Sequence, residues 1–380
     1  MNNNNTGNLA KEIPVFRLDG GELHYLAKHR LKLEFSTLSP FKGQPEGGVE
    51  LSAEAALLLS DSDFKKAVQV LAQPQLKIAL RRGGPASPFG SFTLLARHEK
   101  SRPLVFLEKS GDGLILSYFE NGEKFGEYFA ARFASFPPLK PVNVIKTEHH
   151  PEFALFVLAL ADCYRRAYLH NMLAYSTEPV EGIYEDEFVA ILERELKSSD
   201  LRWLVPSLFM LVESLKERKW EFSGKEVDLA EAMGFISRVA LTENKRPLFL
   251  WGGNGKYWGL EFSLYWRDAM GLEVWTEDVS RGCVQKGCSY YLAFTGEANH
   301  VLEFKEKGSE MEVRHKALTG EETAGEIGEI IIKHLEGLPP IMADKKGGTS
   351  VFKNKQVCDK CGSQILKNAT FCTNCGTKLN

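Results

Sequence analysis

Four cysteines near the C-terminal end place the tightest constraint on how this chain can fold. They form two Cys-x-x-Cys pairs, Cys358 with Cys361 and Cys372 with Cys375, and ten residues separate the pairs. Each pair turns tightly enough to aim two thiolates at one ion, and the spacer returns the chain as a short hairpin. Because four thiolates fill a tetrahedral coordination sphere and leave no position for water, we expect one structural Zn²⁺ at this site.

The residues around these cysteines read Cys-Gly-x-x-Ile and Phe-Cys-x-x-Cys-Gly-x-x-Leu. This pattern resembles the small zinc-ribbon family found at the ends of many bacterial proteins, over residues 357–380. A segment this short cannot bury a core of its own, so metal binding would supply its folding free energy. Cys-x-x-Cys also occurs in redox dithiols, but those lie in a βαβ setting that this segment lacks, which favours zinc.

The 380-residue chain as a whole has an ordinary globular composition. It is 43% hydrophobic and 26% charged, which excludes a disordered or fibrous protein. The longest apolar run, 153–161, is far shorter than the roughly 20 residues of a bilayer span, so we expect no membrane insertion. The first residues, Met-Asn-Asn-Asn-Asn-Thr, lack the basic and apolar regions of a secretory signal. We therefore expect a cytoplasmic protein.

The body of the chain shows an internal repeat. Residues 92–139 and 289–341 each read as three strands, one helix and a Pro-Pro pair. Strand runs separated by hairpin turns favour an antiparallel sheet over a doubly wound parallel one. The predicted fold is α+β, with pseudo-duplicated antiparallel sheet meanders, helices and a small C-terminal zinc ribbon. The expected organisation is a disordered N-terminus at 1–15, a first α+β half at 16–150, a helical middle and second α+β half at 151–341, a linker at 342–355 and the ribbon at 356–380.

Further elements are expected between the repeats. Residues 52–71 predict one or two helices, and 76–81 predict a strand. The middle region, 152–241, carries apolar stripes at helical spacing. After it, 248–251 and 257–266 predict a hairpin around the glycines at 253 and 255. The strand 272–276 would continue that sheet.

No motif of known chemistry stands out in the body, and we predict no catalytic residue and no cofactor besides Zn²⁺. The Gly-rich stretch 251–256 lacks the Ser or Thr that follows Gly-Lys in a phosphate-binding loop. Gly-x-Ser-x-Gly is also missing. Cys283 and Cys288 lie near Arg281 and Lys286, which leaves open an activated thiol as well as an ordinary loop or core cysteine.

An aromatic-rich stretch at 257–278 is a candidate partner-binding face, with Trp258 and Trp266 as its main residues. A face that stacks nucleic-acid bases is usually interleaved with Lys and Arg. This stretch holds one Arg against five acidic residues, which favours either core packing or a protein-binding face over a nucleic-acid face. An exposed aromatic sheet face or groove is a plausible site for a peptide.

The distribution of charge leaves a second class of function open. The net charge is −3, but 344–380 holds seven Lys against two Asp, a formal +5, and the remainder of the chain carries −8. The tail could therefore touch phosphate, as in a nucleic-acid-associated regulator, although four thiolates around Zn²⁺ reduce its charge to about +3. An enzyme whose catalytic groups are scattered along the sequence also stays open.

The segment Gly-Val-Glu-Leu-Ser-Ala-Glu-Ala at 48–55, followed by a helix, by 71–81 and by a strand meander, resembles the EspG-type chaperones of ESX (type VII) secretion. That resemblance implies a quasi-two-fold α/β body without catalytic residues, which holds a helical secretion substrate. The zinc ribbon is a departure from that family. The leading hypothesis is a non-enzymatic protein-binding adaptor or chaperone with a structural zinc-ribbon appendage.

Overall fold

The computed structural model describes residues 13–44, 51–111, 113–137, 141, 148–308 and 310–339, together with the backbone of 356–357 and 364–365. The chain divides into two compact units, Met1–Pro340 and Ile341–Asn380. Almost all of the predicted disordered N-terminus and the whole of the predicted linker lie outside the described residues.

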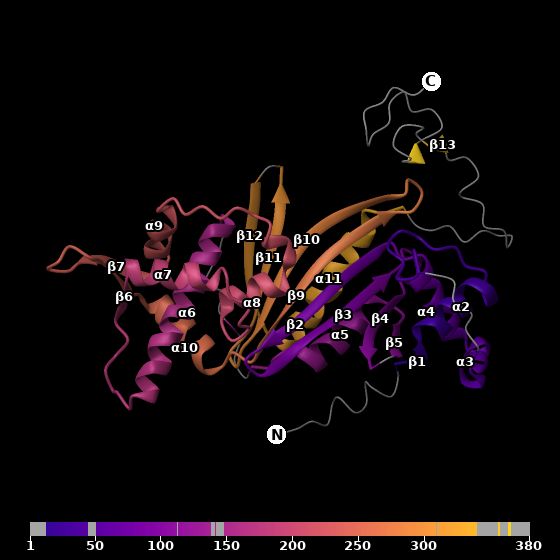
Figure 1. Cartoon of the computed structure of the whole chain (residues 1–380), viewed down its shortest axis with the longest axis horizontal. Coiled ribbons are helices and arrows are strands. Elements are labelled where there is room, and N and C mark those ends of the chain that lie inside the picture. Colours follow the sequence, from indigo (N-terminus) through magenta and orange to yellow (C-terminus); the bar gives the residue numbers. More distant parts are fainter. Residues whose placement is uncertain are drawn as a thin grey trace. The chain divides into compact units, whose positions relative to one another are not determined.

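A nine-stranded antiparallel sheet forms the centre of the first unit (Figure 1). Its order is β1-β5-β4-β3-β2-β9-β10-β11-β12, and each neighbouring pair runs antiparallel. The predicted α+β class with an antiparallel sheet is confirmed. The strands are β1 (Val15–Asp19), β2 (Leu76–Gly84), β3 (Ser87–Ala96), β4 (Leu104–Ser110), β5 (Gly113–Phe119), β9 (Asp268–Asp278), β10 (Cys283–Phe294), β11 (Asn299–Lys307) and β12 (Glu310–Leu318).

The two halves of this sheet repeat one arrangement, as the sequence predicts. The meander β2 to β5 is followed by α5 (Gly122–Phe133), and the meander β9 to β12 is followed by α11 (Gly320–Glu336). The halves meet where β2 pairs with β9, with Leu80 opposite Leu272. Because the first strands of the two meanders are antiparallel neighbours, the repeats are related by an approximate two-fold axis between them. Each repeat begins with a fourth strand, β2 or β9, which the sequence predicted at 76–81 and 272–276 but did not assign to the repeat.

Helices α5 and α11 pack together over one face of the sheet. The sequence allows their close approach at Gly126, where a Cβ atom would lie 2.2 Å from the backbone oxygen of Ala324. Both helices turn apolar residues at helical spacing toward the strands. The buried side chains of these two helices are Phe125, Phe129, Ala130, Phe133, Ile327, Ile330, Ile331 and Leu335.

The other face of the sheet is covered by two separate groups of elements. N-terminal elements cover the β1 to β4 side, and their buried residues form one apolar cluster with strand residues such as Leu95 and Val105. Residues 52–71 are helical, as predicted. These elements are α2 (Gly20–Tyr25), the π-helical turn η1 (Leu26–Arg30), α3 (Ala53–Leu57), the 3-10 turn η2 (Leu58–Ser60) and α4 (Ser62–Ala72).

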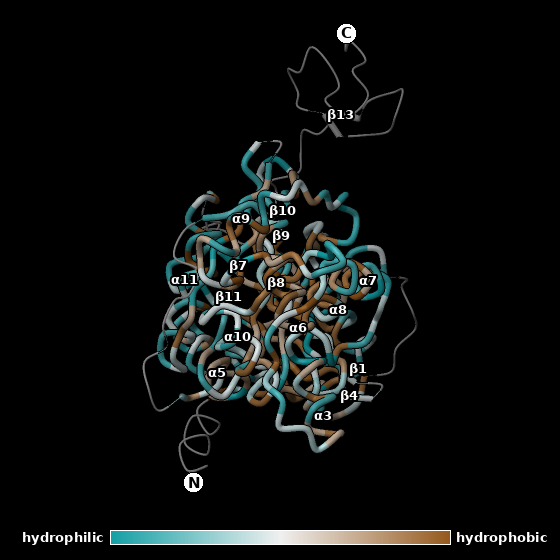
Figure 2. The backbone as a smooth tube through the Cα atoms, turned by 90° about the vertical axis from the view of Figure 1, so that its left-hand side faces the viewer, coloured by the Kyte–Doolittle hydropathy of each residue, from teal (hydrophilic) through white to brown (hydrophobic). Residues whose placement is uncertain are grey.

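The second group, residues 151–267, is here called the helical insert, and it covers the β9 to β12 side. In Figure 2 the hydrophobic stretches of the chain lie mainly in the interior and the hydrophilic ones mainly at the periphery. A small sheet of order β6-β8-β7 completes the insert. Its elements are α6 (Pro151–Leu173), β6 (Gly182–Tyr184), α7 (Glu185–Glu195), α8 (Leu204–Leu211), the 3-10 turn η3 (Glu213–Leu215), α9 (Lys225–Ala232), β7 (Ile236–Leu241), β8 (Pro247–Trp251) and α10 (Gly253–Leu264).

One predicted element is wrong. Most of residues 257–266, expected as a strand, belong to helix α10, and the hairpin partner of β8 is β7. Helix α10 packs on α6 at Gly259, where a Cβ atom would lie 2.4 Å from the ring of Tyr164. The buried residues Trp258 and Phe262 are four apart, which is helical spacing. A run of aromatic residues is locally compatible with a strand and with a helix. The helix forms here because it packs on α6.

Among the helices that the structure describes, none has the length and apolar character needed to cross a membrane.

Candidate protein-binding surface

The predicted zinc ligands Cys358, Cys361, Cys372 and Cys375 lie outside the described residues. In the second unit, β13 (Gln356–Val357) and β14 (Gln364–Ile365) form a short antiparallel pair. In the sequence, the first cysteine pair lies between these two strands. The hairpin that we predicted, in contrast, is formed by the spacer between the two cysteine pairs. Within the described part of the chain, no group of three or more His, Cys, Asp or Glu side chains could hold a metal ion.

The two tryptophans proposed for partner binding lie in the core. Trp258 is 1% exposed and packs against Phe235 and Phe262, with ring centroids 5.7 and 5.4 Å away. Trp266 is 5% exposed, and its indole N–H donates to the backbone oxygen of Asp268 at 3.0 Å. The prediction that they line an exposed strand face is wrong, because α10 turns Trp258 inward, and Trp266, which follows the end of α10, is buried as well.

A different side of α10 carries an exposed apolar stripe. Tyr257, Leu260 and Leu264 follow the i, i+3, i+7 spacing that places side chains on one helix face. Each is between 37% and 44% exposed. Burial raises the pKa of Tyr257 to about 12, and the carboxylates of Glu261 and Glu297 act in the same direction. We call these three residues the α10 stripe.

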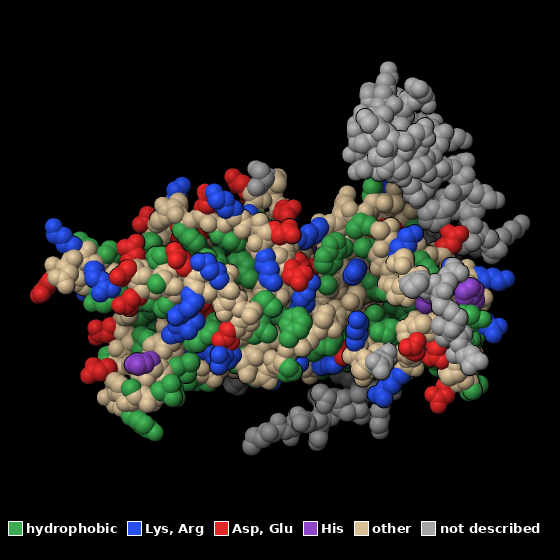
Figure 3. All heavy atoms as spheres, in the orientation of Figure 1, with side chains coloured by type: hydrophobic (Ala, Val, Ile, Leu, Met, Phe, Trp, Pro, Cys, Tyr) green, Lys and Arg blue, Asp and Glu red, His purple; other side chains and the backbone are tan. Residues whose placement is uncertain are grey.

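The α10 stripe belongs to a wider pattern within the helical insert. Of the eighteen large hydrophobic side chains that are exposed in the described residues, thirteen lie between 172 and 265. Figure 3 shows green side chains at the lower left, where the C-terminal end of α6 and α10 lie in Figure 1. Beyond the stripe, the members of this set are Met172, Leu173, Tyr175, Val189, Leu196, Phe222, Leu229, Val239, Leu241 and Tyr265.

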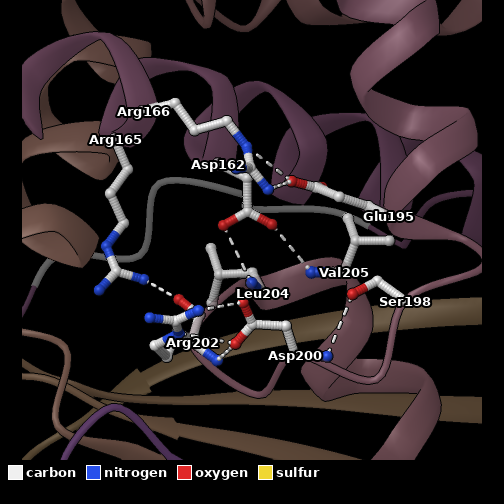
Figure 4. A network of polar contacts seen from close by, with 9 residues as sticks. All are labelled: Asp162, Arg165, Arg166, Glu195, Ser198, Asp200, Arg202, Leu204 and Val205. Carbon is white, nitrogen blue, oxygen red and sulfur yellow. Dashed lines mark hydrogen bonds and ion pairs between the residues drawn. The ribbon is translucent and has the colours of Figure 1, made fainter. Parts of the chain in front are cut away.

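The surface is positioned by a buried carboxylate that joins two helices of the insert (Figure 4). Asp162, fully buried on α6, accepts hydrogen bonds from the backbone N–H groups of Leu204 at 2.9 Å and Val205 at 3.0 Å. These groups open α8, whose own N-cap residue, Trp203, provides no side-chain hydrogen bond. Asp162 thus supplies from another helix the acceptor that an N-terminus requires.

A third helix joins this cluster through Glu195, near the end of α7. Its buried carboxylate accepts two hydrogen bonds from Arg166 of α6, at 2.6 and 3.1 Å. Burial, and secondarily the charge of Glu195, raises the pKa of Asp162 well above its ordinary value. Burial also raises the pKa of Glu195, and Arg166 opposes that shift. Because both carboxyl groups are closed off from solvent, the cluster orients α6, α7 and α8 and offers no open catalytic site.

A second buried chain of polar groups holds α10 on the sheet. Glu261 of α10 lies 2.7 Å from Nε2 of His300 on β11, and His300 Nδ1 lies 3.1 Å from Nε2 of His315 on β12. The hydroxyl of Thr295 donates to the same Glu261 oxygen at 2.5 Å. Sequence reasoning missed both networks, because the contacts that join their helices to one another and to the sheet connect residues at least 29 positions apart along the chain.

Two of the three cysteines of the body, Cys163 and Cys288, have thiol pKa values above the ordinary one. Cys163 is buried, and burial raises its thiol pKa well above the ordinary value. Burial and the nearby Glu303 carboxylate raise the pKa of Cys288 as well. A raised thiol pKa lowers the fraction of thiolate, which is the nucleophilic form. Cys283 is exposed. For Cys163 and Cys288, these shifts favour a structural role.

Comparison with known proteins supports the identification of the tail. A family model of the zinc-ribbon domain matches residues 357–379, which include all four predicted ligands. The resemblance predicted from the cysteine spacing is confirmed, and the tail is similar to zinc-binding modules of this family. The comparison with curated proteins finds no match.

Among solved structures, the chain is similar to one from the complex of the Mycobacterium tuberculosis type VII secretion system chaperone EspG5 with the PE25-PPE41 dimer. The match covers 87% of this chain and 98% of that chain, with a TM-score of 0.36 and 8% identity. The type VII chaperone resemblance therefore finds a weak structural counterpart. A likeness at this level carries no information about the partner of this protein.

Proposed function

We propose that this protein is a non-enzymatic protein-binding adaptor or chaperone, whose helical insert holds an amphipathic helix of its partner. The observation that carries the proposal is the α10 stripe, together with the concentration of exposed apolar residues in the insert. Exposed apolar side chains at i, i+3 and i+7 match the ridges that an incoming helix packs against. Holding a secretion substrate before export would be one form of this activity.

The electrostatics of the body favour binding over catalysis. The strongest upward pKa shifts among the described residues belong to enclosed side chains such as Asp162, Cys163 and Tyr291. These shifts arise mainly from burial, and the groups are engaged in packing or in the helix-joining contacts described above. A perturbed group at a catalytic site would need a path for substrate. None of these three side chains is exposed.

The decisive experiment is capture of partners from the native cell with matched leucine variants. The double substitution Leu260→Asp and Leu264→Asp puts two carboxylates on the α10 stripe. Leu57→Asp is the control, because Leu57 is 71% exposed but lies on α3, outside the insert. The wild type and the control should recover the same protein in similar amounts. The double variant should recover at least about tenfold less of that protein. Cross-links should map to a helix of that protein.

Two outcomes contradict the proposal. Equal recovery by the double variant and the control would show that the α10 stripe does not bind the partner. Nucleic acid recovered only with the full tail, and released by salt, would favour the regulator hypothesis instead. Circular dichroism of each variant checks that its fold is retained.

A further inference from the structure

A pocket of about 500 Å³ opens on the helical insert beside α7, α8 and η3. Its apolar wall is formed by Leu196, Phe209, Met210 and Trp220. The rings of Phe209 and Trp220 meet edge to face, with centroids 5.4 Å apart, and the indole N–H of Trp220 donates to the backbone oxygen of Leu215 at 3.2 Å. These contacts hold the aromatic wall in place, so the pocket is formed without a ligand.

The remaining lining is polar and basic. Lys197 and Lys216 line the pocket together with Ser198 and Ser199, and no acidic side chain is among the described lining residues. The ammonium group of Lys216 lies 3.7 Å from the sulfur of Met210, which is a weak acceptor. Among the described residues, neither lysine forms an ion pair within 4.0 Å.

Three basic residues that are close in sequence to the lining, but not part of it, form ion pairs. Arg202 binds Asp200 at 2.8 Å, Arg218 lies 3.4 Å from Glu152, and Lys219 pairs with Glu221. The two lysines that line the pocket therefore differ from these three residues, because no ion pair with a described residue neutralises their charges. An apolar wall beside two such ammonium groups is complementary to a ligand that carries an apolar side chain and a carboxylate.

We propose that this pocket binds an acidic-apolar segment of a partner protein, with a large apolar side chain on the aromatic wall and a neighbouring Asp or Glu between the two lysines. The volume suits one large side chain and its flanking backbone. The inference rests on the proposed function for the partner being a protein. It concerns α7 and α8 rather than α10, so the two sites are tested by different substitutions.

The test titrates purified full-length protein with two capped peptides, acetyl-Gly-Asp-Asp-Phe-Leu-Gly-amide and its Asn-Asn counterpart, and measures Kd by NMR. The double substitution Lys197→Glu and Lys216→Glu should weaken binding of the Asp-Asp peptide between about twofold and thirtyfold, the range for two partly exposed ion pairs. The charge-matched control, Lys219→Glu with Lys225→Glu, lies outside the lining and should leave Kd within about twofold. Added salt should narrow the difference between the two peptides.

The Asn-Asn peptide should bind more weakly and respond little to either double substitution. Ser199→Trp, which puts a large side chain on the pocket lining, should abolish binding of both peptides. Three outcomes would overturn the inference. The first is equal affinity for the two peptides, and the second is equal effects of the two double substitutions. The third is that the protein binds myristate but neither peptide. The Leu260→Asp and Leu264→Asp variant should bind the Asp-Asp peptide normally. If that variant also keeps its cellular partner, the proposed function fails while the pocket assignment stands.

Discussion

Replacing Asp162 with Ala should destabilise the first unit by about 2–5 kcal/mol. The substitution removes the acceptor of two backbone hydrogen bonds, at 2.9 and 3.0 Å, at a buried helix start. Each buried donor left without a partner costs about 1–3 kcal/mol, and loss of an N-cap alone costs about 0.5–2 kcal/mol. Asp162→Asn should cost less, because its amide oxygen still accepts one of the two hydrogen bonds.

The penalty of each substitution relative to wild type should also depend on pH, because neither Ala nor Asn titrates. The folded-state pKa of Asp162 lies well above the unfolded value, so the folded protein binds this proton more tightly. The stability contributed by that proton is complete below the unfolded pKa and is lost as pH rises through the folded pKa. The penalty of Asp162→Asn relative to wild type should therefore shrink as pH rises across this window.

Urea denaturation at several pH values measures both effects, and hydrogen exchange at the Leu204 and Val205 amides reports on the helix start itself. Those two amides should exchange faster in Asp162→Ala than in the wild type. The reasoning is refuted if Asp162→Ala lies within about 0.5 kcal/mol of wild type, or if the two amides keep their protection. A penalty for Asp162→Asn that grows with pH would refute the assigned direction of the pKa shift.

Two further predictions concern the helix pair and the tail. Gly126→Ala should lower the free energy of unfolding by about 1–3 kcal/mol in chemical denaturation, because its Cβ would meet the backbone of α11. The control Gly325→Ala, whose Cβ would have nothing within 4 Å, should raise that free energy by up to about 1 kcal/mol. Equal effects of the two substitutions would contradict the close packing of α5 on α11. Cys361→Ser should lower the zinc content, measured by elemental analysis, from about one ion per chain toward zero. Urea unfolding of the first unit should stay unchanged. Zinc retained by this variant would contradict the four-thiolate site.

Much of the fold is local enough to be predicted from the sequence. In the strands before α5 and α11, apolar and polar residues alternate or the residues are apolar throughout. Glycine and polar residues mark the turns between these strands, so the order of the strands could be predicted. Residues 257–266 were predicted wrongly, because Trp258 and Phe262 satisfy both an aromatic strand run and a helical spacing. Only contact of α10 with α6 and β11 distinguishes the two structures.

The candidate site depends more heavily on contacts between distant segments. Tyr257 and Trp258 are neighbours in the sequence with the same aromatic character, yet one is exposed and the other is buried. The difference follows from which side of α10 meets the sheet, and that side is set by partners such as His300, 39 residues or more away. The pocket at Lys197 and Lys216 likewise combines residues from separate elements.

The sequence by itself determined the zinc-ribbon tail, the antiparallel α+β class and the repeated order of elements. Those features follow from the spacing of residues close together in the chain, which steric and coordination geometry constrain directly. Only the tertiary structure decided that Trp258 and Trp266 belong to the core, that Asp162 of α6 caps α8, and which apolar side chains remain exposed. Burial depends on which surfaces meet after folding, and no local pattern specifies that.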